Sequence, residues 1–448
     1  MSENRFSRRH FFVGSLLAGA VPVSGFGSVP SLKMLGYKSP NEKLNIAAIG
    51  AGGKGFTDIN GCKSENIVAF ADPDENRASR AFKLYPNAAR YKDFRVLLEK
   101  ESTIDAVTVS TPDHMHGTAA MWAMARGKHV YCQKPLTRTV WEANELRKAA
   151  EKYGVATQMG NQGYSNEGAR QCCEMLWNGD IGDVTEVHAW TDRPGKYWMQ
   201  GPEVEPKEDP VPATLDWDLW LGGAEPQPFS NAYIPIKWRG YPQFGCGAVG
   251  DMACHILGTP NMALRLAAPV SVECVKQEGK SKNTHPQMST IRWDFPARGS
   301  MPPVSLFWHD GLKAQPEIKG VPAGELIGDR DNNGSIFLGD KGIMTTGCYG
   351  ERTRLVPAEK MRDYTLPPAF LTRSPGHYRD WIRAAKGGEP ACSNFSVAGP
   401  FVQWMLLGII AMKFEGKLMW DATKMRFTNN NEANAYLKPK FRKGWKFV

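Results

Sequence analysis

Short apolar segments alternate with longer amphipathic segments over residues 44–160. The apolar segments predict strands at 44–49, 66–71, 104–110, 128–132 and 155–159. Helical patterns fill the gaps between them, notably at 117–126 and 139–152. Because strands that alternate with helices form parallel sheets with helices on both faces, this region predicts an α/β domain with a doubly wound parallel sheet.

The pattern changes after about residue 165. A helix is expected at 167–177, and two more are expected late in the chain, at 375–385 and 398–413. Between them the strand-like segments are 184–190, 270–276, 290–294, 304–309 and 334–338. This region predicts an α+β domain built on one large, mostly antiparallel sheet. We therefore expect two folded domains, at 42–162 and 163–448, behind an N-terminal segment at 1–41.

A glycine-rich turn follows the first predicted strand directly. Gly50, Gly52 and Gly55 form a G-x-G-x-x-G pattern, with Gly53 as a further glycine inside it. Such a turn lets the backbone approach a pyrophosphate, which the N-terminus of the next helix then binds. The second predicted strand ends in Asp72, about 20 residues further on, where the dinucleotide fingerprint has its ribose-binding acid. Together these features predict a Rossmann domain that binds a nicotinamide dinucleotide.

Asp72 also indicates which dinucleotide is bound. A carboxylate at this position accepts a hydrogen bond from a ribose 2′-hydroxyl and repels a 2′-phosphate. The residues that follow directly are Pro73, Asp74 and Glu75, so no arginine stands there to bind a phosphate. We therefore predict NAD as the cofactor. We expect no metal site.

The net charge of +9 is concentrated at the two ends of the chain. Residues 1–43 hold six Lys or Arg and two Glu, and residues 438–446 hold five Lys or Arg, so the residues between are neutral overall. A neutral body argues against a protein that binds the nucleic-acid backbone. The basic tail contains Phe441 and Trp445, and we expect it to pack on the protein's own surface.

The N-terminal segment has the features of an export signal. Ser7, Arg8, Arg9 and two phenylalanines precede an apolar, small-residue run at 14–23. This arrangement predicts a twin-arginine signal and a periplasmic location, with membrane contact limited to a possible signal anchor. Since free NAD is scarce outside the cytoplasm, an exported enzyme is expected to hold its NAD tightly.

Three further segments stand at the ends of predicted parallel strands, where ligands of such sheets bind. They are Thr111-Pro112-Asp113-His114-Met115-His116, Cys132-Gln133-Lys134-Pro135 and Gly160-Asn161-Gln162. Together with the glycine turn and Asp72, these motifs resemble the Gfo/Idh/MocA oxidoreductase family. A later segment, Gly250-Asp251-Met252-Ala253-Cys254-His255, is also similar to that family. The family's usual Glu-Lys-Pro is Gln133-Lys134-Pro135 here, so the carboxylate is missing.

The resemblance implies the roles of three residues. Lys134 would exchange a proton with a substrate hydroxyl as hydride moves to NAD. His255 would act on the same hydroxyl, and Asp251 would orient the substrate. Asp251 and His255 are four residues apart, so a helix over 251–265 would place both on one face. The alternative is that both residues have structural roles. Asp251 would then cap a helix, and His255 would lie in the core and point away from the cofactor.

Other residues are expected at the edges of the same site. Cofactor contacts are predicted for Thr111, Pro112, His116 and Gln133, in addition to the four glycines, Asp72 and Lys134. Substrate contacts are predicted for Asn161, Trp238 and Arg239.

The combination predicts an NAD-dependent oxidoreductase that acts on a secondary alcohol of a sugar or glycoside. One alternative is a redox-neutral glycoside hydrolase, which oxidises a ring carbon, eliminates the aglycone and returns the hydride. A second alternative is a non-catalytic sugar-binding protein on a Rossmann scaffold. We expect a homo-oligomer, either a dimer or a tetramer, with a small-molecule substrate and no nucleic-acid partner.

Overall fold

The computed structural model describes residues 42–203 and 205–447. A compact unit begins at Lys43 and continues to the end of the chain. The predicted twin-arginine signal at 1–41 lies outside the described residues. The boundary predicted at 162/163 falls within the compact unit and stays a prediction.

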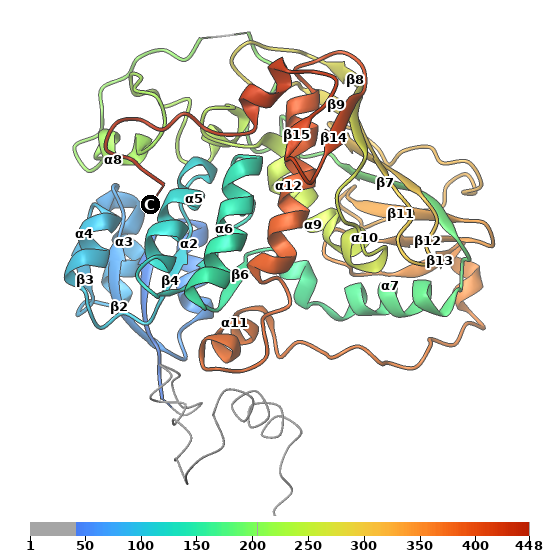
Figure 1. The fold of residues 1–448 in the computed structure, drawn as a ribbon, viewed down its shortest axis with the longest axis horizontal. Helices are drawn as coiled ribbons and strands as arrows, with labels where there is room; N and C mark the ends of the chain where they lie inside the picture. The colour runs from blue at the N-terminus through green and yellow to red at the C-terminus, as the bar shows by residue number, and fades with distance from the viewer. Residues whose placement is uncertain (1–41, 204, 448) are drawn as a thin grey trace, which may run out of the picture. The chain divides into compact units, whose positions relative to one another are not determined.

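The first half of the unit contains the predicted parallel sheet (Figure 1). Its six strands are β1 (Asn45–Ile49), β2 (Asn66–Ala71), β3 (Ala89–Tyr91), β4 (Ala106–Val109), β5 (His129–Cys132) and β6 (Thr157–Met159). They pair in the order β3-β2-β1-β4-β5-β6, and every pairing is parallel. The helices between them are α2 (Lys54–Gly61), α3 (Glu75–Leu84), α4 (Phe94–Lys100), α5 (Asp113–Met124) and α6 (Val140–Tyr153). The strand order reverses between β1 and β4, and ligands bind at such a switch point.

Local sequence explains where several of these helices begin. The side chains of Asp74 and Asp93 accept hydrogen bonds from the first backbone N–H groups of α3 and α4. Thr139 and Glu142 form a reciprocal capping box at the start of α6, and Gly154 ends that helix in the left-handed conformation. These caps hold the helices, and with them the strand-end loops, in fixed positions.

The second half contains a nine-stranded sheet in the order β13-β12-β11-β7-β10-β9-β8-β14-β15. Its longer strands are β7 (Val184–Thr191), β8 (Ser271–Glu278), β9 (Met288–Phe295), β10 (Val304–Asp310) and β11 (Gly334–Gly339). The shorter strands, none of which was predicted from the sequence, are β12 (Ile343–Thr346), β13 (Arg354–Val356), β14 (Leu418–Asp421) and β15 (Arg426–Phe427). Only β7 and β10 pair in parallel, so the predicted α/β plus α+β fold class is confirmed.

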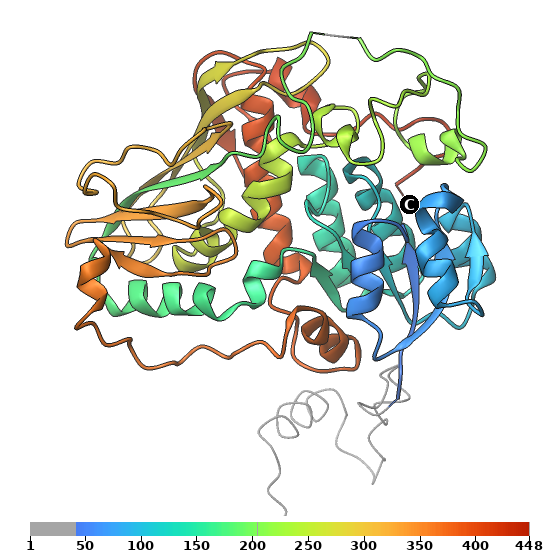
Figure 2. The ribbon, with the colours of Figure 1, turned by 180° about the vertical axis from the view of Figure 1, so that it is seen from behind.

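Helix α12 (Phe395–Ala411) connects the two sheets (Figures 1 and 2). It packs against α6 on one side and against β8 and β9 on the other. Trp404 of α12 lies edge-on to Trp293 and Phe295 of β9, and the indole of Trp293 donates to the Trp404 carbonyl at 2.9 Å. One continuous apolar core therefore holds both sheets, which fixes the cavity between them.

The remaining helices all come from residues 162–436. The α-helices are α7 (Glu167–Asn178), α8 (Trp217–Leu221), α9 (Cys254–Ile256), α10 (Gly258–Ala263) and α11 (His377–Ala385). The 3-10 helices are η1 (Gln162–Ser165), η2 (Lys237–Gly240), η4 (Ala358–Met361) and η5 (Glu432–Tyr436), and η3 (Val249–Ala253) is a π-helix.

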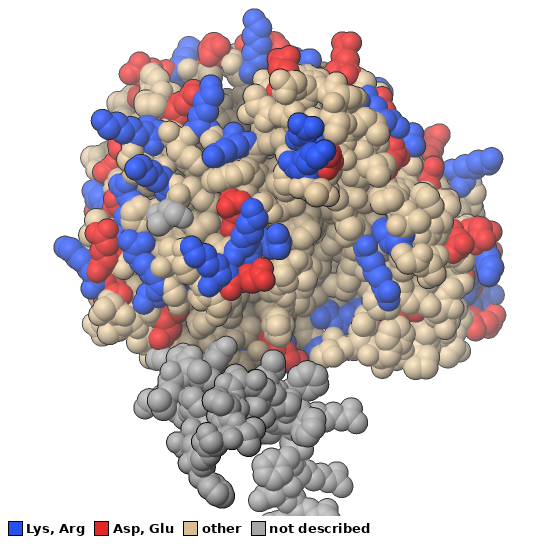
Figure 3. Space-filling model, viewed as in Figure 1, with Lys and Arg blue, Asp and Glu red and all other residues tan. Residues whose placement is uncertain are grey.

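Charged side chains of both signs lie on the face of the molecule shown in Figure 3. There, Lys and Arg side chains are interspersed with Asp and Glu. Within residues 42–203 and 205–447, no helix is long and apolar enough to cross a membrane. All nine cysteines are free thiols, and seven of them are buried.

Candidate active site

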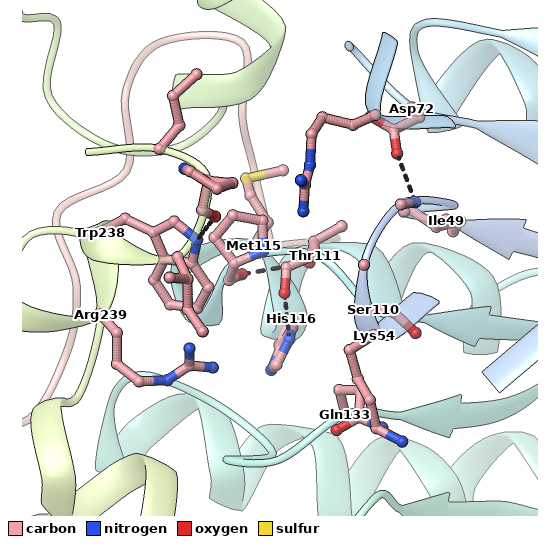
Figure 4. A pocket seen from close by; sticks show the side chains of 18 of the residues that line it. Ile49, Lys54, Asp72, Ser110, Thr111, Met115, His116, Gln133, Trp238 and Arg239 are labelled. Atoms are coloured by element: carbon pink, nitrogen blue, oxygen red, sulfur yellow. Dashed lines mark hydrogen bonds between the residues drawn. The ribbon is translucent and has the colours of Figure 1, made fainter. Parts of the chain in front are cut away.

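A cavity of about 750 Å³ opens at the carboxyl ends of the parallel strands. One end lies beside Asp72 and the glycine turn, and the other lies beside Lys134, His255 and Tyr349. Figure 4 shows the middle of this cavity, with Asp72 and Lys54 on the side of the parallel sheet and Trp238 and Arg239 opposite. The cavity is therefore formed jointly by the parallel sheet and the second half of the chain.

The glycine turn packs against neighbouring backbone more closely than any side chain would allow. Gly50 follows β1 with a φ of +85°, and a Cβ there would lie 2.6 Å from the Ser110 carbonyl oxygen. A Cβ on Gly52 would lie 2.8 Å from the Arg77 carbonyl oxygen. Gly50, Gly52 and Gly53 line the cavity. Gly55 instead packs α2 against the turn, because a Cβ on Gly55 would lie only 2.2 Å from the carbonyl oxygen of Gly50. This backbone fits a dinucleotide pyrophosphate at the N-terminus of α2.

Asp72 stands directly behind the turn. Its Oδ2 accepts hydrogen bonds from the Ala51 and Gly52 N–H groups at 2.8 and 3.3 Å, and its Oδ1 accepts one from Asp74 N–H at 3.0 Å. Burial raises the pKa of Asp72, and these N–H groups oppose that rise. The carboxylate is thus fixed at the cavity edge, where a cofactor ribose is expected.

A cation that the sequence reasoning missed also lies at this end. Arg77 of α3 lines the cavity, and its Nη2 is 3.0 Å from the Cβ position of Gly53. Arg77 is five residues beyond Asp72, and the first turn of α3 brings it back over the glycines. Its charge faces the place where the pyrophosphate would lie.

Gln133 occupies the position of the missing family carboxylate and binds a carboxylate from elsewhere. Its Nε2 lies 3.0 Å from both oxygens of Asp58, which is fully buried in α2. Asp58 also accepts hydrogen bonds from Ser110 and Tyr378 and pairs with Lys54 at 3.1 Å. The charge absent from β5 is therefore supplied by α2, and the Gln133 amide is used by Asp58.

Lys134 and Asp251 meet across the cavity although 117 residues separate them. Lys134 Nζ donates to Asp251 Oδ1 at 2.5 Å and to the Asp251 carbonyl oxygen at 3.0 Å. Arg239 Nε lies 3.0 Å from the same Oδ1, although its N–H is not aligned for a hydrogen bond. Burial alone would raise the pKa of Asp251, but the two cations outweigh burial and hold that pKa well below its usual range. Asp251 is therefore a permanent anion between two cations.

His255 lies in the same cavity as Lys134, one short segment beyond Asp251. The predicted continuous helix over 251–265 is wrong in detail, because the chain forms the π-helix η3 and then the short helices α9 and α10. A wider π turn still leaves Asp251 and His255 facing one cavity. Burial and the charge of Lys134 lower the pKa of His255, and its Nδ1 has no hydrogen-bond partner among the described residues. His255 is thus a neutral imidazole with a free nitrogen.

The other predicted site residues divide into two groups. Thr111, Pro112, His116, Trp238 and Arg239 line the cavity, and Asn161 and Gly55 do not. His116 lies between the carbonyl oxygens of Pro135 and Thr111, at 2.6 and 2.8 Å, and so ties two strand-end loops together. Asn161 is fully buried and accepts a hydrogen bond from Ser393 at 2.5 Å.

Two further residues, the buried Asp113 beside the cavity and Tyr349 in its lining, were not assigned from the sequence. Asp113 starts α5, accepts the Cys246 N–H at 3.0 Å and lies 3.8 Å from Arg239. Burial raises its pKa, and the charge of Arg239 opposes this. Tyr349 follows β12, and its ring centre lies 4.7 Å from that of His255. Asp113 belongs to the motif at residues 111–116, but no sequence signal connects Tyr349 to the site.

Two segments cover the Asp72 end of the cavity; we call residues 212–222 and 438–447 together the cover. Asp216 N–H donates to the Pro73 carbonyl at 2.8 Å, which fixes the first segment beside Asp72. Arg442 binds the first segment to the second by donating to the Gly222 and Asp218 carbonyls at 2.9 and 3.0 Å and to the Asp218 carboxylate. Trp445 lines the cavity, is only 4% exposed and stacks under Arg95 at 3.8 Å. The tail thus packs on the protein surface, as predicted.

A glycine turn with an acid behind it, opening onto a lysine, a histidine and an aspartate, defines a dinucleotide-binding protein with a reaction site. Residues 44–161 match the family model described as oxidoreductase family, NAD-binding Rossmann fold. Residues 184–293 match the model described as oxidoreductase family, C-terminal alpha/beta domain. The chain belongs to the Gfo/Idh/MocA family of oxidoreductases, and its first domain is the family's NAD-binding domain.

Individual relatives match parts of the chain. Inositol 2-dehydrogenase of Serratia proteamaculans is 29% identical over 150 residues, which are 32% of this chain and 44% of that protein. A glycosyl hydrolase family 109 protein of Solibacter usitatus is 28% identical over 200 residues, 41% of this chain and 45% of its own. The chain thus spans under half the length of these curated relatives.

A solved structure agrees over a greater length. The WlbA dehydrogenase from Bordetella pertussis, in complex with NADH and UDP-GlcNAcA, superposes with a TM-score of 0.60 at 14% identity. The match covers 86% of this chain and 99% of that one. At this identity the agreement concerns the fold.

Proposed function

We propose that this protein is an NAD-dependent oxidoreductase that oxidises a secondary alcohol of a sugar or glycoside. The observation that carries the proposal is that Lys134, Asp251 and His255 line one cavity, at the end opposite Asp72. A dinucleotide whose ribose lies beside Asp72 would extend along the glycine turn toward these three residues. When bound, NAD would accept hydride from the alcohol carbon.

The residues can divide the remaining chemistry between them. Lys134 uses two of its three N–H bonds on Asp251, which leaves one to donate to a substrate hydroxyl. That hydrogen bond would stabilise the negative charge that develops on the hydroxyl oxygen. His255 is neutral and has a free Nδ1, so it can accept the hydroxyl proton. Asp251 keeps Lys134 in place, and its Oδ2 accepts no hydrogen bond from the described residues and remains available to orient the substrate.

The cover favours tight retention of the cofactor. Leu215, Leu219 and Trp445 line the cavity beside Asp72, where the adenosine would bind. The contacts of Arg442 hold the two segments of the cover together at that end of the cavity. This supports the expectation that NAD stays on the protein between turnovers.

A second candidate, redox-neutral glycoside cleavage, is favoured by the relative of glycosyl hydrolase family 109. Both candidates begin with the same oxidation and therefore need the same residues. Release of an aglycone without added NAD would favour cleavage, and accumulation of a keto sugar would favour net oxidation. A merely sugar-binding protein would not need an ion-paired Lys134 beside a neutral His255.

Export by the twin-arginine pathway to the periplasm, assembly as a dimer or tetramer, and the boundary at 162/163 are also part of the proposal. Arg8, Arg9 and the apolar run at 14–23 support the export, and the change of pattern near residue 165 supports the boundary. Fractionation of cells, with Arg8 and Arg9 changed together to lysine as the control, tests the export.

The decisive experiment uses the purified full-length protein and a panel of sugars and glycosides. Absorbance of reduced nicotinamide should appear with at least one of them, and Lys134→Met should abolish most of the signal. Lys148→Met, on the exposed side of α6, is the matched control and should behave as wild type. If no sugar or glycoside reduces the bound nicotinamide, the proposal is wrong.

A further inference from the structure

The cations at the Lys134 end of the cavity are mostly neutralised by carboxylates. Lys54 pairs with Asp58 at 3.1 Å, and Lys134 pairs with Asp251 at 2.5 Å. Arg239 lies 3.0 Å from Asp251 and 3.8 Å from Asp113. These charges are thus accounted for within the protein.

Arg193 is different. It lies two residues beyond the end of β7, lines the same cavity, and has no carboxylate within 4 Å among the described residues. Its guanidinium carbon stacks 4.5 Å from the ring centre of Tyr197, which also lines the cavity. Burial raises the pKa of Tyr349, and the nearby charge of Arg193 opposes this rise. The charge of Arg193 is therefore close enough to influence Tyr349, the residue whose ring contacts His255.

Arg77 is the other cation in the lining of the cavity that has no carboxylate partner among the described residues. The cofactor explains its position, but it does not explain that of Arg193. Arg77 lies over the glycine turn, where the cofactor brings two phosphate charges. Arg193 lies near Tyr349, whose ring contacts that of His255, at the end where the substrate would react. With oxidised nicotinamide bound, this end holds two positive charges without a carboxylate partner among the described residues, that of the nicotinamide ring and that of Arg193.

We propose that Arg193 binds a carboxylate of the substrate, and that the substrate class is a sugar acid, such as a uronate, rather than a neutral sugar. This inference rests on the proposed function and narrows it. A planar guanidinium donates two parallel hydrogen bonds to a carboxylate, and its single charge matches that of the acid. A phosphate dianion would need a second free cation, and the neighbouring cations are already paired.

The test compares glucuronate and galacturonate with glucose, galactose and glucose 6-phosphate on the full-length protein. We expect the uronates to reduce bound nicotinamide with a kcat/KM about 10²-fold above that of the matched neutral sugars, the scale of a charge-assisted bidentate contact. Arg193→Gln should remove most of this preference, because it lowers kcat/KM for the uronates far more than for the matched neutral sugars. Arg193→Lys should keep part of the preference for uronates, because the positive charge remains but the bidentate hydrogen bonding of the guanidinium is lost. Arg379→Gln, at an exposed position of α11, is the control and should leave both rates unchanged.

A thermal-shift measurement with the same ligands gives a readout that does not depend on turnover. A uronate that raises the melting temperature of the wild type, but not of Arg193→Gln, supports the inference. Preference for the neutral sugars, or for the sugar phosphate, overturns it while the proposed function stands. If no sugar reduces the nicotinamide, the proposed function fails, and the thermal shift alone decides whether Arg193 binds a carboxylate: no shift with any uronate overturns it.

Discussion

Arg442 should control how fast NAD leaves the protein. Its guanidinium makes two hydrogen bonds to backbone carbonyls of the 212–222 segment, each contributing about 1 kcal/mol net. Its third contact is to the Asp218 carboxylate, which is 72% exposed and so adds little. Arg442→Ala should therefore weaken the closed cover by about 2 kcal/mol, which corresponds to NAD release that is about 30-fold faster.

Exchange of bound NAD for isotopically labelled NAD, followed by mass spectrometry of the denatured protein, measures this rate. Lys443→Ala removes an exposed cation from the next position and should exchange like the wild type. Asp218→Ala should exchange only slightly faster, since it leaves both carbonyl contacts intact. Equal exchange rates for Arg442→Ala and wild type would show that the cover does not retain the cofactor.

Four further outcomes are expected. Lys134→Met should keep NAD bound but slow hydride transfer about 10²-fold or more in single-turnover measurements. His255→Ala should slow the reaction to a similar extent with unchanged NAD content, whereas unfolding with no separable effect on catalysis would indicate a core histidine. Gln133→Glu should lower the melting temperature, because two carboxylates would then meet in a buried site, and adding Asp58→Asn should restore it. Burial raises the pKa of Asp310 to about 6, so its contribution to stability is full below about pH 4 and is lost as pH rises through 6. In urea titrations, Asp310→Asn should lack this loss of about 3 kcal/mol, and an identical pH profile would contradict the argument.

The parallel sheet could be predicted because its signals are local. The glycines around Gly50 and the acid at Asp72 have a spacing that a single βαβ unit fixes, and each predicted strand was found within about two residues. Lys134 could be placed for the same reason, since a strand end and Pro135 define its position. The strands β3 and β12 to β15 were not predicted, because each has only two to four residues and so shows no clear apolar pattern.

The rest of the cavity depends on contacts between distant parts of the chain. Tyr349 meets His255, and Trp445 meets Arg95, only because the second sheet and the tail return to the parallel sheet. No period or spacing in the sequence encodes such a meeting. Asn161 shows the opposite error: a strand-end position placed it near the site, but its side chain turns into the interior toward Ser393.

The hydrogen bonds between Gln133 and Asp58 restrict the order in which substitutions at these two positions can be accepted. In this chain the buried carboxylate is Asp58 of α2, and a glutamate at position 133, the family's usual residue, would carry it directly after β5 instead. A chain that passes between the two arrangements by single substitutions must at some stage carry both acids or neither. Both acids would repel each other in the interior, while two neutral side chains would leave Lys54 without its counter-charge. Residues 58 and 133 are therefore expected to vary together across related sequences, and a search that requires glutamate before the lysine would overlook chains of this kind.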